Sequence, residues 1–95
     1  MKNDEFVGKY VIVRCYSAGV HSGILVSQED DIVVLRNSRR LWRWVAKSGV
    51  ALSGVAQNGI TKSSKIDTIN PLIMLKGVIE IIIASKDAQE SINDF

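Results

Sequence analysis

The sequence predicts a small α+β domain in which a curved antiparallel β-sheet, barrel-like or sandwich-like, carries one or two short helices. The first half of the chain contains several segments rich in β-branched and aromatic residues, separated by short turns. Two more strand-like segments follow residue 70, and two short stretches have helical character. Five or six strands in 95 residues favour a sheet that curls on itself.

The first three predicted strands cover residues 8–17, 20–28 and 31–37. Gly19 is free to take a positive φ in the first turn, and Gly23 marks a bulge or a close approach of two backbones. Because strands joined by short turns usually pair with each other, these segments predict an antiparallel meander.

"RRLWRWV" (39–45) is a fourth candidate strand. Side chains alternate along a strand, so its two faces can be assigned directly from the sequence. Arg40, Trp42 and Trp44 fall on one face, and Arg39, Leu41, Arg43 and Val45 on the other.

A short helix is predicted within residues 49–60, with Ser53 as its cap and Gly59 at its end. The polar stretch 61–71 predicts a loop, and further strands are predicted at 72–75 and 78–85. Both faces of the segment 78–85 are largely apolar, which indicates a central strand or an interface.

The last predicted element is a helix over residues 85–94. It opens with Ser85, three residues before Ala88. Ala88 and Ile92 have the i, i+4 spacing of one helix face.

A chain of 95 residues predicts a single domain over 1–95. It has one cysteine and one histidine, too few for an internal disulfide or a His/Cys metal site within one chain. No enzyme motif, phosphate-binding loop or cofactor motif is present, so we expect a non-enzymatic protein without a cofactor. The absence of a signal peptide or an apolar run of membrane-spanning length predicts a soluble intracellular protein.

Positive charge is concentrated in one part of the chain, although the formal net charge is only +2. There is no Asp or Glu between Ile32 and Ile66, and this window contains seven of the twelve basic residues. Within it, "RNSRRLWRWV" combines arginines, which bind phosphate, with indole rings, on which bases stack. The same tryptophans could simply belong to the core beneath a solvated basic face.

A second candidate lies at the first turn, where Tyr16, Ser17 and His21 surround a glycine-containing backbone. Such a turn can bind a small polar ligand, or it can be an ordinary turn without a ligand. The C-terminal "ESINDF" could be a frayed end, or it could contribute polar groups to a shared site.

Taken together, these stretches resemble the first type of phage-encoded Thoeris anti-defence proteins. "YVIVRCYSAGVHSGIL" looks like the start of that family, and "LRNSRRLWRW" like its arginine pair followed by W-x-W. "ALSGVAQNGI", "VIEIIIAS" and "AQESI" follow in the same order, so the resemblance covers nearly the whole chain from Tyr10 to Ile92.

The resemblance implies a protein that sequesters cyclic ADP-ribose isomers without cleaving them, and so blocks TIR-triggered immunity in the cytoplasm of an infected bacterium. It also implies a homo-oligomer with ligand at the subunit interfaces, and in some members a second pocket for cyclic di- or trinucleotides. The implied ligand-binding residues are Tyr16, Ser17, Ala18, Gly19, His21, Arg36, Asn37, Arg39, Arg40, Trp42, Arg43 and Trp44, with Ser91 and Asn93 from the tail.

An alternative hypothesis is a small β-barrel that binds single-stranded nucleic acid through the basic strand and its tryptophans. A structural phage protein without a small ligand is the third possibility.

Overall fold

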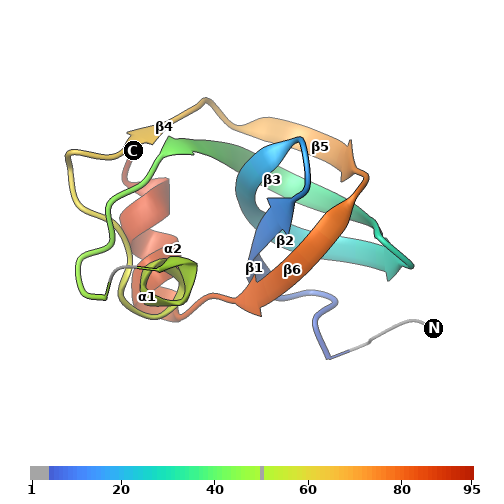
Figure 1. Cartoon of the computed structure of the whole chain (residues 1–95), viewed down its shortest axis with the longest axis horizontal. Coiled ribbons are helices and arrows are strands. Elements are labelled where there is room, and N and C mark those ends of the chain that lie inside the picture. Colours follow the sequence, from blue (N-terminus) through green and yellow to red (C-terminus); the bar gives the residue numbers. More distant parts are fainter. Residues whose placement is uncertain (1–4, 50) are drawn as a thin grey trace.

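The computed structural model describes residues 5–49 and 51–95, and it confirms the α+β class with an antiparallel sheet (Figure 1). The strands are β1 (Tyr10–Cys15), β2 (Gly19–Glu29), β3 (Ile32–Arg43), β4 (Lys65–Ile66), β5 (Asn70–Leu75) and β6 (Val78–Ile83). The helices are α1 (Leu52–Asn58) and α2 (Lys86–Asn93). None of the helices in these described parts of the chain has the length and apolar character needed to cross a membrane.

The sheet has the strand order β4–β3–β2–β1–β6, and β5 pairs with the first half of β3. The predicted meander of the first three strands is therefore confirmed. β5 and β6 follow each other through the turn at Lys76 and Gly77 and then diverge (Figure 1). The sheet is strongly curled but remains open between these two strands.

The third and fourth predicted strands are a single strand of twelve residues, β3. Ser22 pairs with Arg39 and Ile24 with Arg36, so two residues of β3 face the single residue Gly23 of β2. This arrangement is a β-bulge, in which Asn37 has a φ of 52°. A Cβ atom on Gly23 would lie 3.1 Å from the Arg36 carbonyl oxygen, which explains the glycine at the bulge predicted there.

The bulge exchanges the two faces of β3 between its first and second halves. Before it, Val33 and Leu35 face the interior of the curled sheet. After it, Leu41 packs in the cluster beneath the helices, and Arg40 lies beside His21 on the other face. One inserted residue shifts the period-two alternation by one position, so neighbouring side chains exchange environments.

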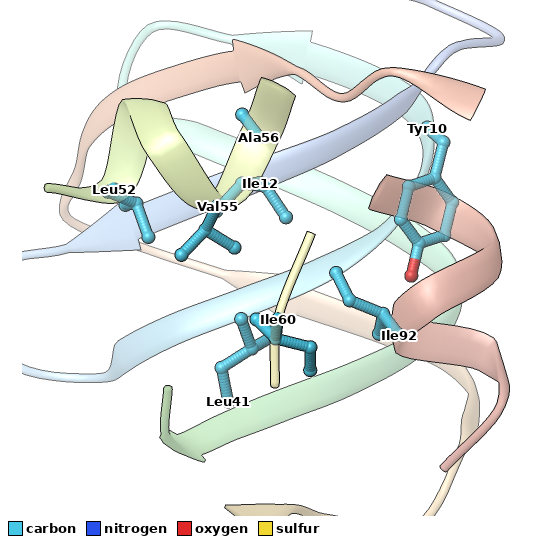
Figure 2. Packing of buried hydrophobic residues seen from close by; sticks show 8 residues of the cluster. All are labelled: Tyr10, Ile12, Leu41, Leu52, Val55, Ala56, Ile60 and Ile92. Atoms are coloured by element: carbon cyan, nitrogen blue, oxygen red, sulfur yellow. The ribbon is translucent and has the colours of Figure 1, made fainter. Parts of the chain in front are cut away.

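Two hydrophobic clusters stabilise the fold. One fills the inside of the curled sheet and consists of Val11, Val13, Cys15, Leu25, Val33, Leu35 and Leu75. The other lies between the sheet and the helices, as Figure 2 shows, and consists of Tyr10, Ile12, Leu41, Leu52, Val55, Ala56, Ile60 and Ile92. β1 contributes alternate residues to both clusters and therefore lies between them.

Two predictions about the later strands are wrong. The segment 78–85 was predicted to be a central strand or part of an interface. β6 is an edge strand of the sheet with Ile79 58% exposed, so the central position is wrong and the interface stays a prediction. The predicted loop 61–71 contains β4 and the start of β5. Pairing with β3 gives these polar residues an extended structure that local composition does not predict.

α1 differs from its prediction at the first turn. Ser53 lies inside the helix, and the N-cap is Ala51, which makes no side-chain capping bond. The helix begins earlier because Leu52 is buried with Val55 against the core. Gly59 ends the helix as predicted, with a φ of 87°.

α2 begins as predicted at Ser85, whose side-chain oxygen accepts a hydrogen bond from the Ala88 N–H at 3.1 Å. Ala88 and Ile92 are buried, so their predicted common face packs against the core. The Ser85 hydroxyl also donates to the Gln57 carbonyl at 2.8 Å and thereby joins the two helices.

We expect Ser85→Ala to lower the free energy of unfolding by about 1 kcal/mol, because it removes an N-cap. Chemical denaturation of the variant and the wild type measures this difference. Ser53→Ala is the matched control, since Ser53 is exposed in α1 and does not cap it. Equal losses in the two variants would contradict the assignment of Ser85 as the cap.

Candidate ligand-binding site at the first β-turn

The turn between β1 and β2 is the centre of the candidate site. Cys15 pairs with Gly19 across the turn, and Gly19 has the predicted positive φ, of 85°. Tyr16 and Ser17 are exposed at its tip, and the Tyr16 side chain is 85% accessible. The turn therefore presents an aromatic ring and a hydroxyl group to solvent.

Arg40 reaches this turn from β3. Its Nη2 donates a hydrogen bond of 2.6 Å to the Ala18 carbonyl oxygen. A Cβ atom on Gly19 would lie 3.3 Å from that nitrogen, so the absence of a side chain leaves room for the guanidinium. The Arg40 side chain makes no other hydrogen bond or ion pair among the described residues, which leaves most of its five N–H groups available.

His21 holds the same carbonyl from the buried side. It pairs with Val13 on one side and Arg40 on the other, and its Nε2 lies 2.9 Å from the Ala18 oxygen. Because a carbonyl only accepts, Nε2 carries the proton in this hydrogen bond. Nδ1 is then a bare acceptor in the neutral ring, and it is buried without a partner among the described residues.

Burial lowers the pKa of His21 below its ordinary value of 6.5. The hydrogen bond to the Ala18 carbonyl opposes this shift, and the nearby Arg40 guanidinium adds to it. Burial also raises the pKa of the Cys15 thiol, although Arg40 acts against that change. At neutral pH the site therefore has a neutral imidazole, a protonated thiol and one accessible cation.

One neighbour of the site was missed in the sequence. The Tyr16 N–H donates to the Gly77 carbonyl oxygen at 2.8 Å, which places the β5–β6 turn against the β1–β2 turn. Lys76 in that turn is exposed and adds a second positive charge nearby. The dipeptide Lys76–Gly77 between two apolar segments signals a turn, but only the tertiary pairing shows which turn it adjoins.

Arg39 has a different environment from its neighbour Arg40. Its side chain is buried, and it donates from Nε to the Asp67 carbonyl at 2.8 Å and from Nη1 to the Ile92 carbonyl at 3.0 Å. These bonds tie β3 to the loop before β5 and to the end of α2. Arg39 therefore has a structural role in this chain.

Trp42 and Trp44 were predicted to share a face, and the structure contradicts this. Trp42 is 70% exposed, whereas Trp44 follows the strand and packs partly against the core cluster beneath the helices. The pairing of β3 with β4 shifts between Leu41 and Arg43, and this irregularity ends the alternation. Trp44 therefore belongs partly to the core, whereas Trp42 is exposed to solvent and its role in stacking stays a prediction.

A second group of exposed residues surrounds Trp42. The Nζ atom of Lys65 lies 5.3 Å from the Trp42 ring centroid, a cation–π contact. Arg43 pairs with Lys65 across β3 and β4, so the strand pairing brings a second basic residue next to Lys65. This group lies on the β3–β4 segment that follows Arg40.

The other predicted residues lie elsewhere. Arg36 and Asn37 are exposed in the middle of β3, and Asn93 is exposed at the end of α2. Ser91 binds both the N–H and the carbonyl of Ile60, beside a surface pocket of about 430 Å³. The structure thus gathers Tyr16, Ser17, Ala18, Gly19, His21 and Arg40 at one turn and does not bring the tail residues to it.

The fold and the site describe a small, curled-sheet domain with a cationic, glycine-containing turn. Residues 8–92 match a family model described as a domain of unknown function, DUF6948, and the chain belongs to this family. Neither a curated protein nor a solved structure matches the chain.

The lowered pKa of His21 predicts an acid-sensitive fold. Between the folded pKa and about 6.5, the unfolded chain binds a proton that the folded chain does not, so stability falls as the pH drops through this window. His21→Gln retains a donor for the Ala18 carbonyl but does not titrate. We therefore expect the stability of this variant to lack the loss caused by protonation of His21. Denaturation at pH 7 and pH 5 compares the two proteins.

The imidazole titration of this single histidine, followed by NMR, provides the direct check. A midpoint at or above 6.5 in the folded protein would contradict the assignment of a buried, neutral ring.

Proposed function

We propose that this protein binds a cyclic ADP-ribose isomer at the β1–β2 turn and sequesters it without cleavage. The observation that carries the proposal is the position of Arg40, held over Gly19 by the Ala18 carbonyl beside the exposed Tyr16 ring. The proposal also rests on the resemblance of the sequence to the Thoeris anti-defence proteins.

Arg40 is suited to the pyrophosphate of such a ligand. A guanidinium binds phosphate oxygens through two parallel N–H groups, and these bonds are stronger than neutral ones. One hydrogen bond to Ala18 orients the side chain in advance, so less conformational entropy is lost when ligand binds. Lys76, in the adjoining turn, adds longer-range attraction for an anion.

Tyr16 is the best-placed aromatic residue for the adenine base. Its ring is accessible and follows directly from β1, whereas the buried His21 ring offers no free face for stacking. In this proposal His21 instead positions the Ala18 carbonyl, and through it Arg40.

Binding without turnover is consistent with the protonation states at the turn. The Cys15 thiol is buried and protonated, a form that is a poor nucleophile. Neutral His21 donates its only ring proton to a backbone carbonyl. A ligand held there meets hydrogen-bond donors and an aromatic ring, which favour retention over reaction.

The biological setting follows from the resemblance alone and is part of the same proposal. A phage protein of this kind would act in the cytoplasm of the infected bacterium and block TIR-triggered immunity. Ligand would lie at interfaces of a homo-oligomer, and cyclic di- or trinucleotides are a second candidate ligand class.

The function is tested by recovery of the ligand. Purified protein is incubated with the nucleotide product of an activated TIR enzyme, filtered and heat-denatured, and the supernatant is analysed by mass spectrometry. We expect intact nucleotide to appear only after heating. Passage of the nucleotide through the first filter would exclude sequestration of that isomer, and a degraded product would exclude a non-enzymatic role.

The same assay identifies the phosphate-binding group. Arg40→Ala should weaken affinity by about 10- to 100-fold, the effect of losing charge-assisted hydrogen bonds. Its stability should change little because Arg40 is exposed. Lys86→Ala, which removes an exposed positive charge on α2, is the matched control and should bind normally.

The exposed Trp42 with Lys65 and Arg43 favours a second candidate, the binding of single-stranded nucleic acid. Salt separates the two functions, because binding of a polyanion releases counterions and weakens steeply with ionic strength. A cyclic nucleotide with two phosphates should give a much shallower dependence. We expect the shallow dependence in titrations from 50 to about 200 mM salt, and a steep one, lost with Trp42→Ala, would favour the nucleic-acid function.

A further inference from the structure

Three turns of the chain meet at the end of the sheet that carries the candidate site. The pairing of β3 with β5 ends at Val33 and Leu75, and the pairing of β1 with β6 ends at Cys15 and Val78. Within the β5–β6 turn the chain therefore passes from pairing with β3 to pairing with β1. This passage brings the β2–β3 turn, at residues 30–31, toward the β1–β2 turn.

One peptide group connects these turns. The Gly77 carbonyl oxygen accepts a hydrogen bond of 2.8 Å from the Tyr16 N–H. The Val78 N–H, which belongs to the same peptide group, donates a hydrogen bond of 3.0 Å to the Asp31 carbonyl oxygen. The N–H and C=O of a trans peptide group point in opposite directions, so Tyr16 and Asp31 lie on either side of it. Since paired strands are about 5 Å apart, the backbones of these two residues are about 10 Å apart.

Asp31 differs in chemistry from the groups already described at the site. Arg40 and the hydroxyl groups of Tyr16 and Ser17 offer hydrogen-bond donors to a ligand, whereas a carboxylate only accepts. The Asp31 side chain is exposed and has no hydrogen-bond or ion-pair partner within residues 5–49 and 51–95. It therefore adds a free acceptor group beside a set of donors.

We propose that Asp31 is the specificity-determining residue of the ligand site, and that its carboxylate accepts hydrogen bonds from two neighbouring ribose hydroxyl groups. The inference rests on the proposed function, because it assigns one more contact to the same ligand. Carboxylates bind ribose hydroxyl groups in dinucleotide-binding folds, and their two oxygens suit a pair of hydroxyls. Arg40 reaches the β2 side of the first turn, and Asp31 lies beyond its β1 side, so Tyr16 lies between them. A nucleotide whose base stacks on Tyr16 can thus direct phosphate to Arg40 and ribose to Asp31.

Such a contact distinguishes between the two candidate classes of ligand. A cyclic ADP-ribose isomer keeps a ribose with two free neighbouring hydroxyl groups. In a cyclic di- or trinucleotide, one of these hydroxyls is esterified on every ribose, so no ribose has a free pair. A site that binds a hydroxyl group by hydrogen bonding discriminates strongly against ligands that lack it. Asp31 therefore selects cyclic ADP-ribose isomers over cyclic oligonucleotides.

A cycle of one protein variant and one change to the ligand tests the contact. The ligand is the cyclic ADP-ribose isomer recovered from the wild type in the heat-release assay. The changed ligand is the same nucleotide with its free ribose hydroxyl pair masked as an isopropylidene acetal. Calorimetry gives both affinities for the wild type and for Asp31→Asn. We expect masking to weaken binding to the wild type by about tenfold or more, the effect of losing hydrogen bonds to a charged group, and to change binding to Asp31→Asn little.

Asp30→Asn is the matched control, because it removes the same charge from the neighbouring position of the turn. Asp30 lines a hollow of about 510 Å³ with Val34 and Met74, and its φ of 54° suits asparagine. Losing this charge reduces repulsion of the pyrophosphate, so the control should bind the unmasked ligand at least as well as the wild type. Asp31→Asn should bind it about tenfold more weakly.

The outcomes separate this inference from the proposed function. Continued binding of the masked ligand by Asp31→Asn shows that the variant is folded. If masking weakens the wild type and Asp31→Asn equally, or if Asp31→Asn binds like the control, Asp31 does not contact the ribose, although sequestration stands. A wild type that retains no nucleotide overturns the proposed function and this contact with it.

Discussion

The bulge that opposes Asn37 and Ser38 of β3 to Gly23 of β2 is the constraint on which the rest of the structure depends. Before it, β3 belongs to the curled sheet and pairs with β5; after it, β3 extends beneath the helices and pairs with β4. A regular strand would keep one set of alternate residues inside throughout. The bulge lets one strand serve both hydrophobic clusters.

Strand alternation directs the two neighbouring arginines to opposite faces, and the bulge determines which face each one occupies. Arg39 is directed toward the helices, and its side chain donates hydrogen bonds to the carbonyls of Asp67 and Ile92. Arg40 is directed to the β1–β2 turn, where a single carbonyl holds it and solvent remains accessible. Two residues of identical chemistry thus differ in role because they lie on opposite faces of one strand.

Sequence reasoning succeeded where structure is set locally. Ser85 as an N-cap, Gly59 at a helix end, the positive φ of Gly19 and the bulge at Gly23 all follow from the properties of single residues. It failed where pairing between distant segments determines the secondary structure. The union of two predicted strands into β3, the edge position of β6 and the extended conformation of β4 depend on tertiary contacts that no local pattern contains. For the candidate site, it identified the turn and Arg40, but not the contact of the turn with Gly77.

The group at the centre of the candidate site is a main-chain atom, the carbonyl oxygen of Ala18, which accepts hydrogen bonds from both His21 and Arg40. Every amino acid has this oxygen, so the identity of the side chain at position 18 carries little information about the architecture around it. The Ala18 side chain packs partly against the cluster inside the curled sheet but takes no part in these hydrogen bonds, so a chain with the same alanine could lack the arrangement. Comparison of such proteins is therefore more informative at positions 19, 21 and 40. His21 and Arg40 donate the hydrogen bonds to the carbonyl, and Gly19 leaves room for the guanidinium.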